Sequence, residues 1–287
     1  MKNPQNFVSV SGVSSIEQLE EIGNFCRLEK FNSPVVIGYQ FSNKSINQGT
    51  HNPRQPRISH LREITEKTLD YGLITAFHYY TKDNLTIVGD LEKLVSLSGA
   101  NPEKTLVQLN TLPANVKTLK QIKQIGFKTI FKVAVSDKSS EGYAIWKGHE
   151  VQDFHFGDIS ALIGQVYERK AFIDYVLFDP SHGVGLDLNL SPGSLAVRFG
   201  KEISQRFKNL GLVYAGGIGP NNAAETITFL LNYFPQGFSI DAESGLRNIV
   251  KNNSGKTLDE LDLNSVKKYL MSVHDGLKMQ SKSAAQK

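Results

Sequence analysis

The chain has 287 residues, of which 40% are hydrophobic and 21% are charged. This composition excludes a disordered chain and allows a sizeable core, and the length suits a single α/β barrel of about 250 residues. Lysine and arginine number 32 against 28 for aspartate and glutamate, an excess far below the clustered basic stripe that nucleic-acid binding needs.

Cysteine content and hydropathy indicate the cellular setting. With one cysteine, Cys26, the chain has no intramolecular disulfide, and no Cys/His grouping has the spacing of a zinc site. The stretch MKNPQNFVSVSG lacks the apolar run of a signal peptide, and no segment approaches the roughly 18 apolar residues that span a bilayer. We therefore expect a cytoplasmic protein without a metal site and without membrane or nucleic-acid partners.

Short runs rich in apolar, β-branched or aromatic residues predict eight strands. In chain order these are residues 7–11, 35–41, 73–79, 105–110, 129–135, 174–179, 212–216 and 238–242. Helical spacing and capping residues predict helices at residues 14–31, 58–72, 115–126, 158–171, 193–209, 220–234 and 263–277. The pattern is a strand followed by a helix, repeated along the chain.

The repeated strand–helix unit favours parallel strands, because each return to the sheet requires a crossover that a helix supplies. A G-x-G-x-x-G turn after the first strand, typical of a doubly wound sheet, is absent. We therefore predict an α/β fold of the (β/α)8 type, a TIM barrel. It forms a single domain over residues 1–278, followed by a flexible polar tail at residues 279–287.

Two predicted loops exceed the usual connection of about 2 to 6 residues. Residues 42–58 follow the second strand, and residues 136–154 follow the fifth. Both leave the carboxyl ends of strands, where barrel enzymes build their sites, so they are candidates for lids. Solvated insertions without a role at the site are the alternative.

The segment LVYAGGIGPNNAAETI, residues 212–227, contains a candidate anion site. A strand runs into Gly216 and Gly217, and a proline with two asparagines opens the next helix. Glycines let the backbone approach a ligand, and a helix amino terminus favours an anion. The last strand repeats this design with Ser244 and Gly245. These four residues are predicted to bind phosphate, as the loops after the last two strands of such barrels usually do; tight turns without a ligand are the alternative.

Several segments resemble one known family when they are taken in chain order. They are FVSVSGVSSIEQL, VVIGYQFSNKS with the later QPRIS, TLVQLN, DYVLFDPSHGVGLDLNL, VYAGGIGPNNAAETI and IDAESGLR. These stretches resemble the first, second, fourth, sixth, seventh and eighth strand motifs of the phosphoribosylanthranilate isomerases of tryptophan biosynthesis. The resemblance touches nearly the whole chain.

The resemblance implies an Amadori rearrangement of an aminoaldose phosphate to an aminoketose phosphate, with a small phosphorylated molecule as substrate and no metal or redox cofactor. The family's general acid, which opens the ribose ring, falls on Asp179. Its general base is a cysteine that removes the C2 proton, and this position falls on Ser11. A serine hydroxyl is a poor base unless a neighbour takes its proton. Either another residue acts as base, or the isomerase activity is changed or lost.

Three residues are candidates for a replacement base, namely Asp241 in the last strand, His78 near the end of the third strand and His182 in the loop after the sixth. A histidine titrates near the pH at which a general base works, and a carboxylate accepts a proton when it is close enough. Structural or surface roles are the alternative for each residue, because geometry decides which group reaches the substrate.

The resemblance also implies residues that bind the substrate. The family's arginine for the anthranilate carboxylate falls on Arg57, with Arg54 as the second candidate. A guanidinium suits a carboxylate because it donates two parallel hydrogen bonds. Gly183 in the loop after the sixth strand and Asp241 complete the predicted substrate-binding set.

Two other functions remain open on the same scaffold. Lys132 lies in the fifth strand, where its alternation with neighbouring residues points it into the barrel, and a strand lysine can form a Schiff base in a lyase or aldolase. The alternative is a buried, paired lysine or a neighbour of the phosphate. A non-catalytic homologue that binds a phosphorylated metabolite is the other possible function, since Ser11 stands where the family has its base.

Overall fold

Eight parallel strands form a closed barrel in the computed structural model, which describes residues 4–31, 33–50, 52–110, 114–133, 135–137, 142–147, 150–155, 158–180, 188–251 and 257–284. The barrel strands are β1 (Val8–Ser11), β2 (Val35–Ser42), β3 (Ile74–Tyr80), β4 (Leu106–Leu109), β5 (Lys128–Lys132), β9 (Tyr175–Phe178), β10 (Gly211–Ala215) and β11 (Ser239–Ala242). The predicted TIM barrel is confirmed.

Closure of the barrel follows from the pairing of its first strand. The order around the barrel is β1-β11-β10-β9-β5-β4-β3-β2, and β1 pairs in parallel with both β11 and β2. Ser11 lies opposite Gly38 of β2, and Val10 lies opposite Ala242 of β11. The carboxyl ends of all eight strands therefore meet at one end of the barrel.

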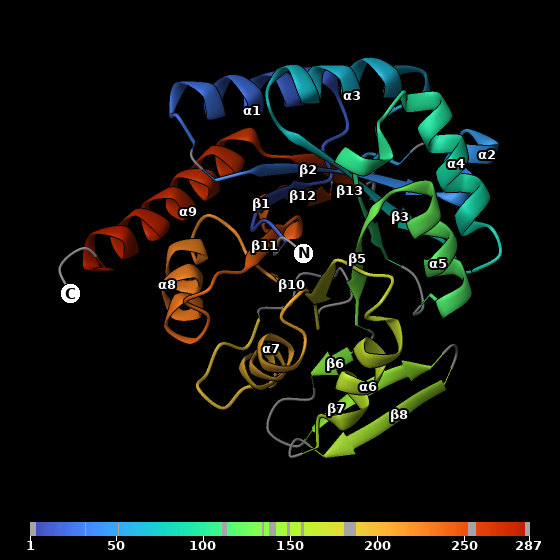
Figure 1. Cartoon of the computed structure of the whole chain (residues 1–287). Coiled ribbons are helices and arrows are strands. Elements are labelled where there is room, and N and C mark those ends of the chain that lie inside the picture. The colour runs from blue at the N-terminus through green and yellow to red at the C-terminus, as the bar shows by residue number, and fades with distance from the viewer. Residues whose placement is uncertain are drawn as a thin grey trace.

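Helices surround the barrel as an outer ring (Figure 1). They are α1 (Ile16–Leu28), α3 (Leu61–Asp70), α4 (Ile87–Ser98), α5 (Val116–Ile125), α6 (Ser160–Arg169), α7 (Leu195–Arg206), α8 (Ala223–Tyr233) and α9 (Leu263–Ala284). Several begin at a side-chain cap: Ser15 Oγ accepts from Gln18 N before α1, and Asn115 Oδ1 accepts from Thr118 N before α5. Helix α9 continues as far as Ala284, into the segment expected to be a polar tail.

The apolar core has two parts. The larger part fills the space between the barrel and the helices, while a smaller cluster includes Phe7, Val36, Ala76, Leu106, Ile130, Tyr175, Leu177, Val213 and Ala215 and fills the barrel interior. Side chains alternate along a strand, so the residue two places further on faces the interior again. At those places the sequence turns polar, with His78, Gln108, Lys132 and Asp179. The apolar side chains of the barrel interior are therefore followed by polar side chains at its carboxyl end.

Three parts of the chain differ from the sequence-based expectation. Helix α4 lies between β3 and β4, where no helix was predicted. Most of residues 136–154, expected to be a loop, belongs to a three-stranded antiparallel sheet of β6 (Val135–Asp137), β7 (Gly142–Lys147) and β8 (Glu150–His155). A hairpin of β12 (Arg247–Lys251) and β13 (Thr257–Leu261) follows β11.

The segment after β2 also has local structure. It begins with the short helix α2 (Asn43–Gln48), which Ser42 caps by accepting a hydrogen bond from Ser45 N, and it ends at the 3-10 turn η1 (Ile58–His60). Two other 3-10 turns are η2 (Pro102–Lys104) before β4 and η3 (Ser244–Leu246) after β11. The 42–58 segment is therefore a partly helical connection rather than an irregular loop.

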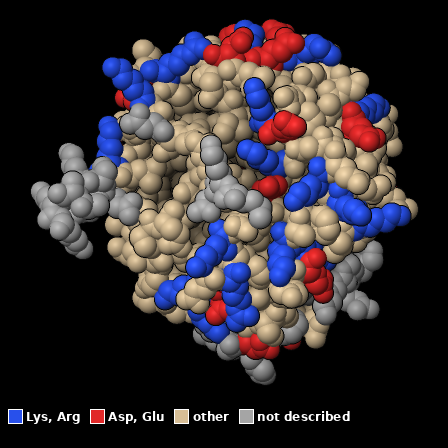
Figure 2. Space-filling view, in the orientation of Figure 1, with Lys and Arg blue, Asp and Glu red and all other residues tan. Residues whose placement is uncertain are grey.

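Charged side chains are interspersed on the face of the molecule shown in Figure 2. Lysines and arginines form several separate groups there, with acidic side chains among them. No helix of the described residues is long and apolar enough to cross a membrane.

Candidate active site

Polar side chains from six barrel strands or the residues directly after them lie inside the carboxyl end of the barrel. They are Ser11 (β1), His78 (β3), Gln108 (β4), Lys132 (β5), Asp179 (after β9) and Asp241 (β11). Except for Lys132, which is partly buried, these residues are buried. Buried polar groups require partners, and each of the six has a hydrogen bond or ion pair within this set.

The first pair in this ring joins Ser11 and Asp241. Ser11 Oγ donates a hydrogen bond to Asp241 Oδ1 over 2.6 Å, and Ser9 Oγ lies 3.2 Å from Ser11 Oγ. The parallel register of β1 and β11 brings the two side chains together, since Ser9 is the Cα partner of Asp241. Asp241 thus places a carboxylate, a proton acceptor, directly beside the Ser11 hydroxyl, which by itself is a poor base.

Gly38 of β2 separates Ser11 from His78. A Cβ placed on Gly38 would lie 2.4 Å from Ser11 Oγ and 2.9 Å from His78 Nε2. The hydroxyl and the imidazole therefore occupy the space that any larger residue would fill. On its other side, His78 Nδ1 lies 3.4 Å from Gln108 Nε2, which also donates to Asn110 Oδ1 over 3.1 Å.

Replacing Gly38 by alanine is expected to destabilise the protein by roughly 1–3 kcal/mol, because the added methyl group overlaps with two buried polar side chains. Urea unfolding measures this change. Gly89→Ala in α4 is a matched control, because a Cβ at that position meets nothing within 4 Å and alanine favours a helix. Equal stability of the two variants would contradict the crowding around Ser11.

The second pair joins Lys132 and Asp179. Lys132 Nζ lies 2.5 Å from Asp179 Oδ2, and the exposed fractions of the two side chains are 14% and 10%. Neighbouring strands place them, since Lys132 is the Cα partner of Leu177 in β9. A nucleophilic lysine must be uncharged, whereas Lys132 is one member of a buried ion pair. This contact favours the structural or proton-handling role of Lys132 over a Schiff base.

The predicted phosphate-binding residues come together at the ends of β10 and β11. Gly216 and Gly217 have φ angles of 117° and 58°, a left-handed conformation that favours glycine. The two turns touch through their backbones, because a Cβ on Gly245 would lie 2.4 Å from Ile218 O. Within the described residues, no hydrogen bond leaves the N–H groups of Gly217, Ser244 or Gly245. No acceptor among the described residues therefore competes with an anion for these donors.

Asn222 fixes the first of these turns. Its Oδ1 accepts a hydrogen bond from Gly219 N over 2.9 Å, and its Nδ2 donates to Gly217 O over 3.0 Å. Helix α8 begins directly after Asn222, so its amino terminus lies beside the turn. In the order of strands, β10 lies between β9 and β11. The glycine turn therefore stands between Asp179 and Asp241.

The predicted substrate arginines differ in their surroundings. Arg57 is exposed, and no ion pair joins its side chain to another residue of the described ranges. Arg54 instead pairs with two carboxylates, Nη1 lying 2.6 Å from Glu243 Oε1 and Nε lying 2.6 Å from Asp259 Oδ2. Burial alone would lower the pKa of Arg54, but the hydrogen bonds and charges of Asp259 and Glu243 outweigh it and raise the pKa.

Arg247 connects this ion network to β1. It pairs with Asp259 through Nε, and its Nη1 donates to Gly12 O over 3.0 Å. Its side chain is fully buried. Gly12 has a φ of 81°, and a Cβ there would lie 2.7 Å from Arg247 Nη1. The β12–β13 hairpin is thereby attached to the end of the strand that carries Ser11.

The network predicts an acid-sensitive contribution to stability. Burial alone would raise the pKa of Asp259, but hydrogen bonds from Arg247 and Arg54 lower it below the ordinary value of 3.8. Folding therefore favours the ionised form, so the stabilisation is present above the ordinary pKa and is lost as pH falls through the lower folded pKa. Urea unfolding of Asp259→Asn should show a smaller loss of stability between neutral pH and about pH 3 than the unaltered protein. Asp275→Asn, a control at an exposed position of α9, should lose as much stability between the two pH values as the unaltered protein. Identical pH dependence in both variants would contradict the role given to Asp259.

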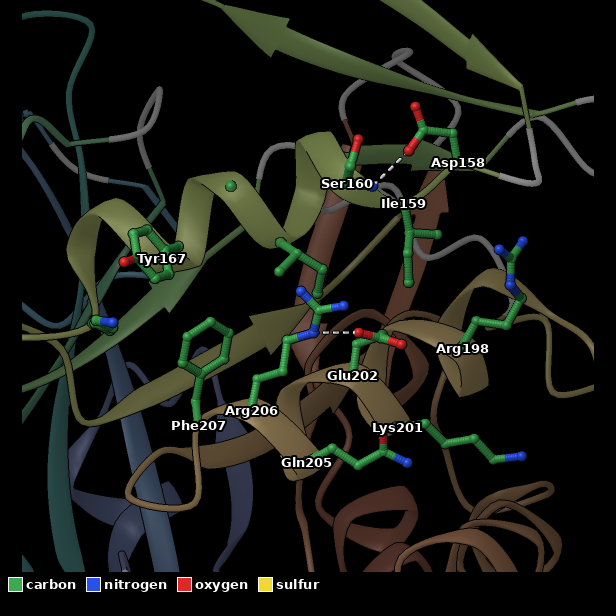
Figure 3. A pocket seen from close by; sticks show the side chains of 13 residues that line it. Asp158, Ile159, Ser160, Tyr167, Arg198, Lys201, Glu202, Gln205, Arg206 and Phe207 are labelled. Atoms are coloured by element: carbon green, nitrogen blue, oxygen red, sulfur yellow. Dashed lines mark hydrogen bonds and ion pairs between the residues drawn. The ribbon is translucent and has the colours of Figure 1, made fainter.

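A separate groove lies between α6 and α7 on the outer surface of the barrel (Figure 3). Its volume is about 770 Å³, and none of the predicted site residues lines it. Several of its charges are already engaged: Arg206 Nε lies 2.5 Å from Glu202 Oε2, and Asp158 accepts a hydrogen bond from Ser160 N. The groove is therefore distinct from the polar ring.

The sequence predicts Ser11, Asp179, Asp241 and the two glycine turns as site residues, and the structure brings these residues to one end of the barrel. Gly38, Gln108 and the partners of Arg54 were not predicted. Two further predictions, Gly183 and His182, lie outside the described residues. No group of three or more His, Cys, Asp or Glu side chains in the described ranges is arranged to hold a metal ion.

No known family model matches the chain, and no match was found among curated proteins.

Proposed function

We propose that the protein is a phosphosugar isomerase of the phosphoribosylanthranilate isomerase type. Its substrate is an aminoaldose phosphate and its product is the corresponding aminoketose phosphate. The observation that supports this function best is the presence of two proton-handling pairs, Ser11–Asp241 and Lys132–Asp179, on opposite sides of a glycine turn suited to phosphate.

The Lys132–Asp179 pair acts as the acid in this reaction. The pair holds a transferable proton between an ammonium and a carboxylate 2.5 Å apart, and Asp179 passes it to the ring oxygen of the sugar. The bond between C1 and the ring oxygen breaks as the nitrogen lone pair forms a protonated imine at C1. The proton comes in effect from the Lys132 ammonium, so Lys132 ends as a neutral amine beside the Asp179 carboxylate and regains a proton from solvent before the next turnover.

The Ser11–Asp241 pair acts as the base. The C2 proton moves to Ser11 Oγ while the proton of Ser11 moves along its hydrogen bond to Asp241 Oδ1, whose oxygen lies 2.6 Å from Ser11 Oγ. The serine therefore remains neutral and the aspartate ends protonated. The electron pair of the C2–H bond forms the C1=C2 bond and neutralises the imine nitrogen. Proton transfer from the C2 hydroxyl to C1 completes the aminoketose. The base therefore combines two residues where the resembled family uses one cysteine.

The direct test is turnover of N-(5′-phosphoribosyl)anthranilate by the purified full chain, with complementation of a tryptophan auxotroph that lacks the isomerase. Conversion to the ketose product is expected. A folded protein that binds phosphate but fails in both assays would contradict the assignment to this reaction.

Ser11 itself supports a second candidate, a non-catalytic protein that binds a phosphorylated metabolite. Ser11→Cys distinguishes the two functions, because a thiolate is a better base than a hydroxyl. If the serine pair is catalytic, the variant should alter the pH dependence of an existing turnover. Turnover that arises only in Ser11→Cys would favour the non-catalytic function of the natural chain.

A further inference from the structure

Arg54 links the segment after β2 to the loop after β11. Its guanidinium lies 2.6 Å from a carboxylate oxygen of Glu243 on one side and 2.6 Å from one of Asp259 on the other. All three side chains are about four-fifths buried. Two charge-assisted hydrogen bonds on different edges of the planar group hold it in one orientation.

Glu243 brings a negative charge to the chain directly before the predicted anion site. Glu243 directly precedes Ser244 and Gly245, whose N–H groups are among the donors of the predicted phosphate site. A carboxylate next to a bound phosphate would repel it, and partial burial weakens the screening of that repulsion by water and salt. A positive group must compensate Glu243 if the turn is to bind a phosphate.

Arg54 is positioned to compensate the charge of Glu243. Its second ion pair, with Asp259, holds the guanidinium in that position. Asp259 belongs to β13 and also pairs with the buried Arg247, so it is part of a fixed framework. It holds the Nε edge of Arg54 while Nη1 faces Glu243. Arg57, three residues further along the same segment, is exposed and has no such contact with a described residue.

We propose that Arg54 is the charge-compensating residue of the phosphate site: it neutralises Glu243 beside the Ser244–Gly245 turn and so allows a phosphate group to bind there. This inference rests on the phosphate site of the proposed function. It assigns to the 42–58 segment a role in substrate affinity, and it makes Arg54 a positioning residue rather than a catalytic one.

The test is titration of the full chain with inorganic phosphate, and in parallel with ribose 5-phosphate, by isothermal calorimetry. Arg54→Gln should weaken phosphate binding by roughly tenfold, because it leaves the Glu243 charge uncompensated. Glu243→Gln should bind phosphate at least as tightly as the unaltered protein. The double variant Arg54→Gln/Glu243→Gln should recover most of the lost affinity, since the repelling charge is gone.

Lys44→Gln is the matched control, as it removes the same charge from an exposed position of α2 in the same segment. Its phosphate affinity should equal that of the unaltered protein. Arg54→Gln binding phosphate as tightly as Lys44→Gln would overturn the inference. Failure of the unaltered protein to bind either ligand would instead contradict the phosphate site itself. A circular-dichroism melt of each variant shows whether it is folded. Recovery of phosphate affinity in the double variant would also show that Arg54→Gln does not act by unfolding the protein.

Discussion

Replacing Asp241 by asparagine is expected to reduce isomerase turnover by roughly 10²- to 10⁴-fold, the usual loss for a removed general base. The amide has nearly the same shape, and its oxygen still accepts the hydrogen bond that Ser11 Oγ donates over 2.6 Å. It cannot take the proton of Ser11, so the C2 proton of the substrate has no final acceptor. The fall should appear in kcat, with phosphate affinity unchanged.

Steady-state kinetics with N-(5′-phosphoribosyl)anthranilate measures this effect. Asp70→Asn is a suitable control, because Asp70 ends helix α3 on the outside of the barrel and is exposed. It should leave kcat and KM unaltered. Full activity of Asp241→Asn would show that the base lies elsewhere, with His78 on the other side of Gly38 as the next residue to test.

Substitutions in the Lys132–Asp179 pair should also lower turnover, but their effects should not add. Lys132→Met and Asp179→Asn are each expected to lower turnover by roughly 10²- to 10⁴-fold, because each removes one half of a single proton donor. Residues that act as a unit are not additive, so the double variant should lose little more than either single variant. The 2.5 Å contact between Nζ and Oδ2 is the reason to expect this behaviour.

Lys128→Met is the matched control for this pair, since Lys128 is an exposed lysine at the other end of the same strand. Kinetics of the four variants gives the coupling between Lys132 and Asp179. Losses that multiply in the double variant would contradict a shared proton. Trapping of a borohydride-reduced substrate adduct on Lys132 would favour the lyase or aldolase chemistry instead.

The barrel was predictable from the sequence because each βα unit carries a local signal. Runs such as VVIGYQF and LVYAG have the length and branching of buried strands, and the glycine turns after residues 215 and 243 mark the ends of the last two. Since parallel strands end at one edge, the carboxyl-terminal positions of Ser11, Asp179 and Asp241 already implied a common location. The structure adds their pairing and distances.

The features that were missed depend on tertiary contacts or on weaker local signals. Helix α4 contains Gly89 and begins with β-branched residues, which reduce its helix propensity. GYAIWK and EVQDFH, which form β7 and β8, alternate as strands do, but they lay inside a segment treated as one loop. The importance of Gly38 depends on the register of β1 and β2, which places it opposite Ser11.

The ion pairs of Arg54 and Arg247 could not be predicted because they also depend on tertiary contacts. Arg54 and Arg57 belong to one short stretch, and nothing local separates an arginine that meets two carboxylates from one that faces solvent. Asp259, which joins Arg54 to Arg247, lies more than two hundred residues away from Arg54 along the chain. Such contacts follow from the closure of β1 against β11, which brings the two ends of the barrel sequence together.

The central claim, that this barrel abstracts the C2 proton of an aminoaldose phosphate, is tested most directly by proton NMR in D₂O. With N-(5′-phosphoribosyl)anthranilate and the unaltered protein, we predict loss of the C2 proton signal and a product that carries deuterium at C1. Asp241→Asn should leave the C2 proton in place. Retention of that proton by a folded, phosphate-binding unaltered protein would contradict the account.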